Sequence, residues 1–258
     1  MQPAWLETWS ETRERGRFRE YTISIDVLIL ALDTTTRAGS VAVTDDDRVL
    51  TLLAGDESRT HGERLPAEIA TALDRASVTR EQLDLLAVAA GPGGFTGLRI
   101  GLAVMQGLAM TLNKPVAGVS TLAALAAQVD GPVSFVVPWM DAQRGDVFAT
   151  VVDGRSKRTV QAPVAEHPVS VLERWQPYLA GQQAIFIGDA VSRDADLIAS
   201  AGNGRWTIRI PDPLAPQIAY LGRELARQGR AGAPHALTPL YVRRPDAELE
   251  RDKRGADH

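Results

Sequence analysis

The chain has 258 residues, of which 28 are Lys or Arg and 32 are Asp or Glu, so its formal net charge at pH 7 is −4. This acidic balance argues against a protein that binds nucleic acid by itself through a basic face. Cysteine is absent, which excludes disulfides, a thiol nucleophile and thiolate metal ligands. The length suits one large domain or two smaller lobes.

The two ends of the chain differ from the rest. Residues 1–26 are rich in Arg and Glu and lack the apolar core of a secretion signal. We expect an N-terminal extension there, either poorly ordered or a short amphipathic helix, before the fold begins near Val27. Residues 246–258 are charged, and we expect a frayed tail there. The most apolar stretch, Ile100–Leu112, is shorter than the run of about 20 apolar residues that a membrane span needs, so no membrane contact is expected.

The first half of the chain predicts the element order βββαβα. Thr60 and Glu63 match the capping-box pattern, and apolar residues then recur at helical spacing as far as Ala76. A glycine-rich turn at 91–94 opens a second helix, from about Thr96 to Asn113. Strands are predicted by short apolar or alternating runs at 27–32, 40–44, 48–54 and 83–89.

The same order recurs in the second half, after a linking strand at 116–119 and a helix at 121–128. The expected elements are strands at 133–138, 146–153 and 157–160, a helix at 169–178, a strand at 184–187 and a helix at 191–201. A last helix is expected at about 217–228, after three prolines. Two copies of βββαβα predict an α/β fold of two lobes, with mixed sheets covered by helices.

These elements suggest a division of the chain. We expect the first lobe at 27–114 and the second lobe at 115–212. The last helix and the segment after it, at 213–245, are expected to pack back on the lobes.

The most specific motif is the run Gly91-Pro92-Gly93-Gly94-Phe95-Thr96-Gly97-Leu98-Arg99-Ile100-Gly101. A glycine turn between a strand and a helix can present backbone N–H groups to an anion. However, a P-loop needs Lys and then Ser or Thr after its last glycine, whereas Leu98 and Arg99 follow Gly97. A dinucleotide site needs an acid about 20 residues on, where Val119 and Ser120 stand. A structural turn and a phosphate cradle both remain open.

The helix after this run carries no charge from Ile100 to Asn113, and its apolar residues occur on every side. A helix that is apolar all round must be covered all round. One face can pack on its own sheet, and the other needs a second element or a second protein. Two interpretations therefore stay open: a central core helix, or a helix of a partner surface.

Two turns could face a nucleotide. Asp33, Thr34 and Thr35 follow the first strand, and Gly188 and Asp189 follow a strand of the second half. In two-lobed ATP-binding folds, turns of this kind face the phosphates, with the acid near the metal. Alternatively, both are tight turns in which Asp and Thr side chains satisfy the backbone.

Other catalytic patterns are missing from the sequence. No two histidines stand at the helical spacing that binds a metal, and there is no G-x-S-x-G nucleophile elbow. Asp141 and Arg144 could form a polar pair at the lobe interface or a surface salt bridge. We therefore expect no catalytic residue, no metal and no cofactor.

Several segments together resemble the bacterial TsaB family, also called YeaZ. They occur in the family's order over about residues 27–247, at 30–36, 61–65, 91–101, 118–122, 141–148 and 237–243. The departures are few, since Gly62 and Gly94 stand where Ser is common. The first 26 residues have no family counterpart.

The resemblance implies an actin-like fold, related to sugar kinases and heat-shock ATPases, in a cytoplasmic protein. It also implies a non-catalytic role in making threonylcarbamoyladenosine beside the tRNA anticodon. A TsaD-type partner would carry the metal and transfer threonylcarbamoyl from threonylcarbamoyl-AMP to the adenosine amine, with a small TsaE-type ATPase joining the two. Transfer RNA would be bound only within the complex, and the free protein could form a homodimer.

The resemblance further implies that the partner binds the helices of the first lobe. The residues expected at this partner surface are His61, Glu63, Arg64, Leu65, Ile69, Leu73, Phe95, Leu98, Arg99, Leu102 and Met105. The alternative function is a sugar-kinase-like, ATP-dependent phosphotransferase. It would bind its nucleotide through Asp33, Thr34, Thr35, Gly188 and Asp189. A peptidase, an old label for relatives of this fold, has no nucleophile or metal cluster here to support it.

Overall fold

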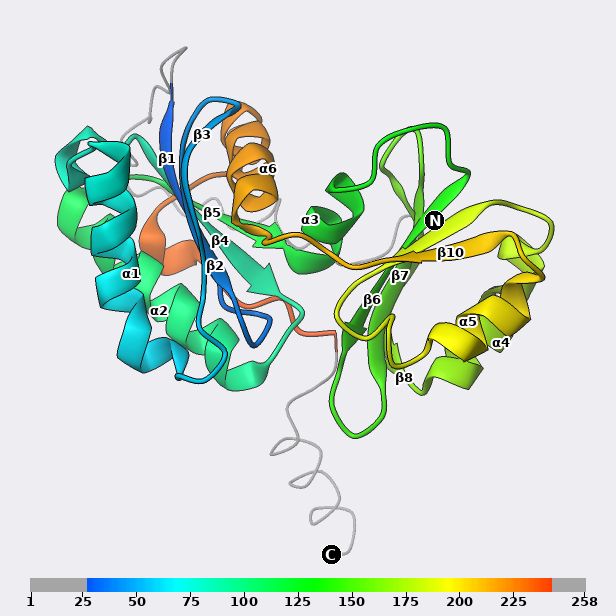
Figure 1. Cartoon of the computed structure of the whole chain (residues 1–258). Coiled ribbons are helices and arrows are strands. Elements are labelled where there is room, and N and C mark those ends of the chain that lie inside the picture. Colours follow the sequence, from blue (N-terminus) through cyan, green and yellow to red (C-terminus); the bar gives the residue numbers. More distant parts are fainter. Residues whose placement is uncertain (1–26, 243–258) are drawn as a thin grey trace, which may run out of the picture.

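The computed structural model describes residues 27–242, which form two lobes, each built on a five-stranded sheet (Figure 1). The extension expected at 1–26 and the charged tail expected at 246–258 lie outside the described residues. The two-lobed α/β architecture predicted from the sequence is confirmed.

The sheet of the first lobe has the strand order β3-β2-β1-β4-β5; β1, β2 and β3 are antiparallel, and β4 and β5 run parallel to β1. Its strands are β1 (Leu28–Asp33), β2 (Ser40–Asp45), β3 (Arg48–Ala54), β4 (Leu85–Gly91) and β5 (Val116–Ser120). Helices α1 (His61–Ala76) and α2 (Phe95–Leu112) cover one face, and α6 (Ala215–Arg227) covers the other (Figure 1). A short 3-10 turn, η2 (Arg80–Gln82), precedes β4.

Strand β1 shows why both faces are covered. Leu30 and Leu32 belong to the apolar cluster under α1 and α2, whereas Ile29 and Ala31 belong to the cluster that includes α6. Successive side chains of a strand point to opposite faces of the sheet, and in β1 both sets are apolar. A continuous apolar run of this kind requires cover on each side.

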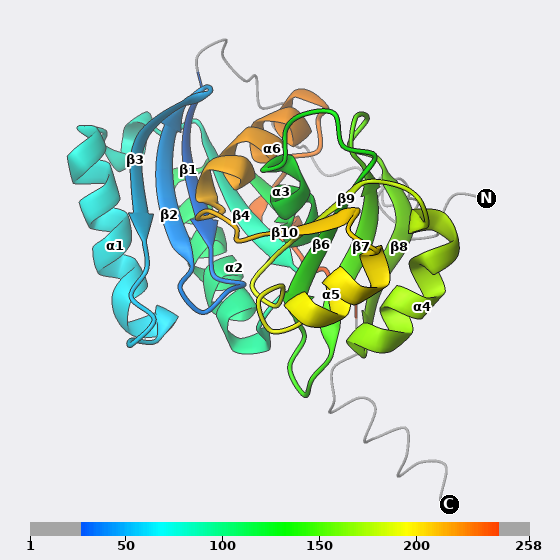
Figure 2. The ribbon, with the colours of Figure 1, turned by 45° about the vertical axis from the view of Figure 1, so that its right-hand side comes forward.

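The second lobe repeats this plan with the strand order β10-β9-β6-β7-β8 (Figure 2). Its strands are β6 (Phe135–Asp141), β7 (Val147–Asp153), β8 (Thr159–Glu166), β9 (Ala184–Ile187) and β10 (Trp206–Arg209). Helices α4 (Pro168–Leu179) and α5 (Ala195–Gly202) cover the outer face, and α3 (Thr121–Ala127) packs on the inner face. A 3-10 turn, η3 (Pro234–Ala236), follows α6.

Each repeat is longer than the sequence pattern predicts. Strand β5 and helix α3 end the first copy, and β10 and α6 end the second, so the order is βββαβαβα in both. Because β5 pairs with β4, the first sheet extends one strand beyond the boundary expected at residue 114. The last helix of the second copy, α6, returns to pack on the first sheet and thereby joins the lobes.

Local differences from the expected elements have physical reasons. Strand β8 runs over Thr159–Glu166, well beyond the expected 157–160, because it pairs with β7 through residues of mixed polarity at an exposed edge. Helix α5 begins at Ala195, four residues later than expected. The residues before it form a turn, which Trp139 of β6 holds in place by donating from Nε1 to Asp194 Oδ2 over 2.8 Å. Helix α6 begins at Ala215, earlier than expected, since a proline fits the first turn of a helix.

Candidate functional site

The turn after β1 is closed by the carboxylate of Asp33. Its Oδ1 accepts hydrogen bonds from Thr35 N at 2.8 Å and Thr35 Oγ1 at 2.6 Å, and its Oδ2 accepts from Thr36 Oγ1 at 3.1 Å. Asp33 is buried, and this burial raises the pKa of its carboxyl group above the usual value. Both carboxylate oxygens are therefore engaged inside the turn itself.

The glycine-rich run packs directly on this turn. Gly94 N donates to Thr35 O over 3.0 Å. A Cβ atom on Gly97 would lie 2.2 Å from Thr34 O, and one on Gly101 would lie 2.1 Å from Thr34 Oγ1. Neither space can hold a side chain, so these glycines allow the start of α2 to approach the turn. The contacts favour the structural interpretation of the motif over the phosphate cradle.

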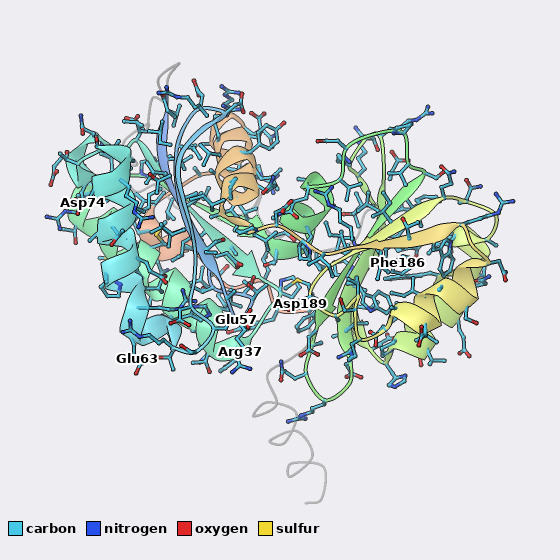
Figure 3. All side chains as sticks on the ribbon, viewed as in Figure 1. Arg37, Glu57, Glu63, Asp74, Phe186 and Asp189 are labelled. Atoms are coloured by element: carbon cyan, nitrogen blue, oxygen red, sulfur yellow. The ribbon has the colours of Figure 1, made fainter. Side chains whose placement is uncertain are left out.

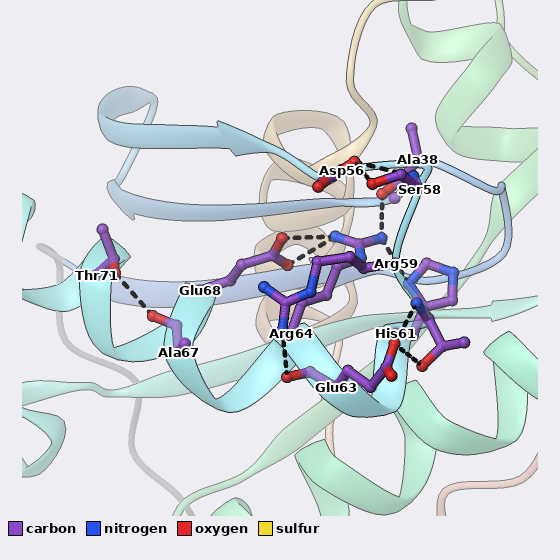
Figure 4. Close-up of polar contacts among 12 residues, drawn as sticks. Ala38, Asp56, Ser58, Arg59, His61, Glu63, Arg64, Ala67, Glu68 and Thr71 are labelled. Atoms are coloured by element: carbon purple, nitrogen blue, oxygen red, sulfur yellow. Dashed lines mark hydrogen bonds and ion pairs between the residues drawn. The ribbon is translucent and has the colours of Figure 1, made fainter.

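His61, the first residue of α1, bridges this helix to the same turn (Figure 4). Its Nε2 lies 3.0 Å from Thr36 O, and its Nδ1 lies 2.8 Å from Arg64 Nη2. Because a carbonyl oxygen can only accept, Nε2 carries the proton and Nδ1 accepts from the guanidinium. Partial burial, and then the charge of Arg64, lower the pKa of His61 below its usual value.

Arg64 is the centre of this network. Its Nη1 donates to both carboxylate oxygens of Glu68, at 2.7 and 2.8 Å, and its Nη2 also donates to Ala38 O (Figure 4). Arg64 is only 3% exposed. His61 and Arg64 were both expected at the partner surface, but their side chains point back to the β1–β2 turn and hold α1 on it.

Most apolar residues expected at the partner surface are in the core instead. They pack between the helices and the sheet, where the first lobe has its own apolar cluster: Leu65, Ile69, Leu73, Leu98, Leu102 and Met105. The expectation that these six residues form an exposed partner surface is therefore wrong, because a helix on a sheet buries the side that faces the strands. Of the expected residues, Glu63, Phe95 and Arg99 remain exposed.

The outward side of α1 and α2 presents a different set of residues, which we call the α1–α2 face. Its small or apolar exposed members are Pro66, Ala67, Ala70, Phe95, Ala103, Gly107 and Met110. The same two helices also expose charged or hydroxyl side chains at Glu63, Asp74, Arg75, Thr96, Arg99 and Thr111. Met110 is 68% exposed. The one charged residue in α2 is Arg99. The small side chains at Ala103 and Gly107 would let a second helix approach α2 closely.

Helix α2 is also the one described helix long and apolar enough to cross a membrane, with 18 residues and a mean hydropathy of 1.3. The helix is longer than the apolar stretch Ile100–Leu112 considered in the sequence, because it begins at Phe95. A single helix of this kind is weak evidence for a membrane, since core helices pass the same test. Leu98, Leu102 and Met105 pack on the sheet.

The segment after α6 runs alongside α2, from Gln106 toward the start of the helix. Gln106 Nε2 donates to Pro234 O at 3.1 Å and to Leu237 O at 2.9 Å, and Leu240 N donates to Ala90 O at 2.6 Å. These bonds place Tyr241 beside α2. Tyr241 lies in the segment 237–243 that resembles the TsaB family, but neither it nor Gln106 was expected at a site, because nothing periodic links this segment to a helix far earlier in the chain.

Tyr241 takes part in an exposed cluster with Phe95 and Arg99, which we call the Arg99 cluster. The two rings stack with centroids 6.1 Å apart, and the Arg99 guanidinium carbon lies 3.9 Å from the Phe95 centroid. Arg99 Nε donates to Tyr241 Oη over 3.2 Å. The cluster therefore fixes the position of a surface cation.

The second turn, Gly188-Asp189, lies at the junction of the lobes (Figure 3). Asp189 Oδ1 accepts from Asp141 N at 2.9 Å, and Asp141 also pairs with Arg193 at 3.0 Å. Partial burial raises the pKa of the Asp189 carboxyl group, and the charges of Asp141 and Asp33 raise it further. The residues expected at a nucleotide site thus lie on both sides of the junction. Within residues 27–242, no group of three or more His, Cys, Asp or Glu side chains could hold a metal ion.

Comparison with known proteins identifies the family. The family described as "TsaD: tRNA N6-adenosine threonylcarbamoyltransferase" matches residues 55–202, more than half of the chain. An uncharacterized protein of Mycobacterium tuberculosis is 31% identical over 85% of this chain and 93% of its own length. The tRNA threonylcarbamoyladenosine biosynthesis protein TsaB of Bacillus subtilis is 28% identical over 86% of this chain and 96% of its own.

Solved structures agree with this result. The structure of YeaZ from Pseudomonas aeruginosa superposes with a TM-score of 0.67 and 27% identity, covering 83% of this chain and 99% of that chain. Sequence and fold therefore point to the same group of proteins. The chain belongs to the TsaD-type family, and within it to the TsaB (YeaZ) proteins.

Proposed function

We propose that this chain is the non-catalytic scaffold subunit of the complex that transfers threonylcarbamoyl from threonylcarbamoyl-AMP to the N6 amine of the adenosine next to the tRNA anticodon. Its task is to bind and activate a metal-bearing TsaD-type subunit. The membership of the TsaB family supports the pathway. The observation that carries the binding role is the α1–α2 face.

The α2 half of this face has little of the polar cover that a helix normally presents to water. On α2, the exposed Phe95, Ala103, Gly107 and Met110 occur in a helix with a single charge. Contiguous exposed apolar area of this kind marks protein–protein contacts in soluble proteins. A related subunit with the same fold would offer a matching helix pair, and small residues let the helices approach closely. A specific interface buries about 1,600 Å² in total, which two helices from each protein can supply.

The chemistry is assigned to the partner. In this chain, the carboxylate of Asp33 is already engaged with Thr35 and Thr36. Transfer RNA is proposed to bind only the assembled complex, because a net charge of −4 supplies few phosphate contacts. A TsaE-type ATPase as third component, a homodimer of the free protein and a cytoplasmic location complete the proposal.

A matched pair of variants tests the α1–α2 face. Ala103 lies in the middle of α2 and Ala199 in the middle of α5, and both are exposed. Ala103→Glu should abolish binding of the TsaD-type subunit from the same organism in titration calorimetry, whereas Ala199→Glu should leave it unchanged. Both variants should melt like the parent protein. Tight binding by Ala103→Glu would place the interface elsewhere.

Reconstitution tests the catalytic division. Threonylcarbamoyl-AMP, tRNA and this chain alone should give no modified adenosine, and adding the TsaD-type subunit should start the reaction. Product formed by the isolated chain would refute the non-catalytic assignment.

A sugar-kinase-like phosphotransferase remains the second candidate, because the charge of Asp33 in the first lobe helps to raise the pKa of Asp189 in the second. Titration of the isolated chain with Mg-ATP separates the two functions. Micromolar binding that is lost in Asp189→Asn would favour the kinase. No measurable heat favours the scaffold.

A further inference from the structure

Arg99 is an unusual residue for its position. It is exposed, it is the one charged residue of a mostly apolar helix, and no ion pair joins it to a carboxylate within residues 27–242. Elsewhere in the same lobe, the buried arginines Arg64 and Arg223 each bind acidic side chains. Arg99 instead uses Nε on Tyr241 and its flat face on Phe95, and no described residue takes its two Nη groups.

The surroundings of Arg99 hold it in one place. Phe95 lies one helical turn before it, so the guanidinium stacks on the face of the Phe95 ring. Tyr241 comes from the C-terminal segment, which Gln106 and the Leu240–Ala90 hydrogen bond anchor on α2. A surface Arg normally loses side-chain entropy when it binds, and a guanidinium that is already fixed loses less.

The position of Arg99 decides what must bind it. A partner that covers the α1–α2 face also removes water from Arg99, and a desolvated cation without a counter-charge is strongly unfavourable. A guanidinium is best matched by a carboxylate, which can accept two parallel hydrogen bonds from its planar fork.

We propose that the Arg99 cluster is a carboxylate-recognition site, and that an Asp or Glu side chain of the partner subunit binds Arg99. This inference rests on the proposed function. The ion pair would lie at the N-terminal end of α2, at the edge of an apolar contact that by itself specifies no direction. It would therefore set how the helices of the two subunits are aligned.

A protein carboxylate fits better here than an RNA phosphate. Binding to nucleic acid draws on several phosphate contacts at once, and α2 offers one cation. The cluster is also continuous with the apolar α1–α2 face, since Phe95 belongs to both.

The test uses the full chain and the TsaD-type subunit of the same organism. Arg99→Glu should weaken their affinity by about a hundredfold or more, because a buried carboxylate would face another. Arg99→Lys keeps the charge but loses the fork, so about a tenfold loss is expected. Arg158→Glu, an exposed position in the second lobe, is the control and should bind normally. All three should keep the parent melting temperature.

Charge exchange then identifies the partner residue. Each Asp and Glu on the partner's helices is changed to Arg in turn, and one of these variants should restore affinity for Arg99→Glu. Restoration at a single position supports the ion pair. If none restores binding, the carboxylate proposal is wrong.

The outcomes separate this inference from the proposed function. If Ala103→Glu abolishes binding while Arg99→Glu binds like the parent, the face is the interface and the carboxylate site is refuted. If neither variant affects binding, both proposals fail. If Arg99→Glu keeps full affinity for the subunit but the assembled complex binds tRNA more weakly, Arg99 contacts phosphate, and the carboxylate proposal is overturned.

Discussion

His61 Nδ1 and Arg64 Nη2 lie 2.8 Å apart, one turn apart on α1, and this contact requires a neutral imidazole. Arg64 also reaches Glu68 and Ala38 O, so the pair joins α1 to the β1–β2 turn. The same turn receives the glycine run of α2. One small network therefore sets the relative position of the two helices that form the proposed partner surface.

A pH dependence follows from His61. The pKa of His61 is lowered in the folded protein, so in a window below its unfolded value near 6.5 the unfolded chain binds a proton that the folded chain does not. The free energy of unfolding should therefore fall as the pH is lowered through this window. Above about pH 7.5 His61 is neutral in both states, so it no longer makes the free energy of unfolding depend on pH.

Urea denaturation from pH 8 to pH 5 measures this effect. His61→Gln keeps a donor for Thr36 O and an acceptor for Arg64, but it does not titrate, so its stability should change less with pH. The comparison is needed because Asp33, Glu68 and Arg64 also lie near the ring. Parallel pH profiles for the two proteins would show that His61 does not gain a proton on unfolding.

Arg64 should be among the most important charged residues for stability. Arg64→Met leaves the carboxylate of Glu68, itself 18% exposed, without its partner, along with the Ala38 carbonyl. We expect a loss of about 3 kcal/mol, the lower end for a broken buried pair. Arg48→Met is the control, because the Arg48–Asp45 pair is at the surface and should contribute less than about 1 kcal/mol. Equal effects in denaturant titration would contradict the buried network.

The glycines of α2 should differ in their tolerance of a methyl group. Gly101→Ala places Cβ against Thr34 Oγ1 and should destabilise the protein, whereas Gly107→Ala meets nothing within 4 Å and should stabilise it by about 0.5–1 kcal/mol. Thr34→Ala removes the obstructing oxygen. The double variant should therefore recover part of the stability that Gly101→Ala loses. If Gly101→Ala is as stable as Gly107→Ala, the close approach is not real.

Two methionines on α2 separate core from surface. Met105 is fully buried and Met110 is 68% exposed, yet they stand five residues apart in the same helix. Met105→Glu should unfold the protein or make it insoluble, because an unpaired charge would enter the core. Met110→Glu should fold normally and bind the TsaD-type subunit less tightly. Circular dichroism melting and calorimetry measure the two effects.

These methionines also show which features of the fold sequence patterns cannot predict. The apolar runs of β1, β2 and β9 predict strands close to those found, because short buried strands leave a strong local signal. Helix α2, however, is apolar on all sides, so its periodicity cannot identify the side that the sheet covers. Strand β10 is as short as β9, but it is mostly exposed and lacks a continuous apolar run, so its local signal is weak. It exists because it pairs with β9.

The site shows the same limit. Asp33 and its threonines form a local turn that the sequence indicates directly. The contact of Arg99 with Tyr241 joins residues 142 positions apart and depends on the whole fold. Such contacts are set by tertiary packing, which a single sequence does not display.

The hydroxyl of Tyr241 should act through Arg99. Tyr241→Phe keeps the stacking on Phe95 but removes the acceptor for Arg99 Nε, so the guanidinium loses part of its orientation. We expect the affinity for the TsaD-type subunit to fall about three- to tenfold, the range for one ordinary hydrogen bond, with no change in melting temperature. If Tyr241 had only a structural role, the loss of affinity caused by Tyr241→Phe would be the same with or without Arg99. The double variant with Arg99→Ala tests this, because in that background Tyr241→Phe should have no further effect on affinity. Additive losses in the double-mutant cycle would show that Tyr241 does not position Arg99.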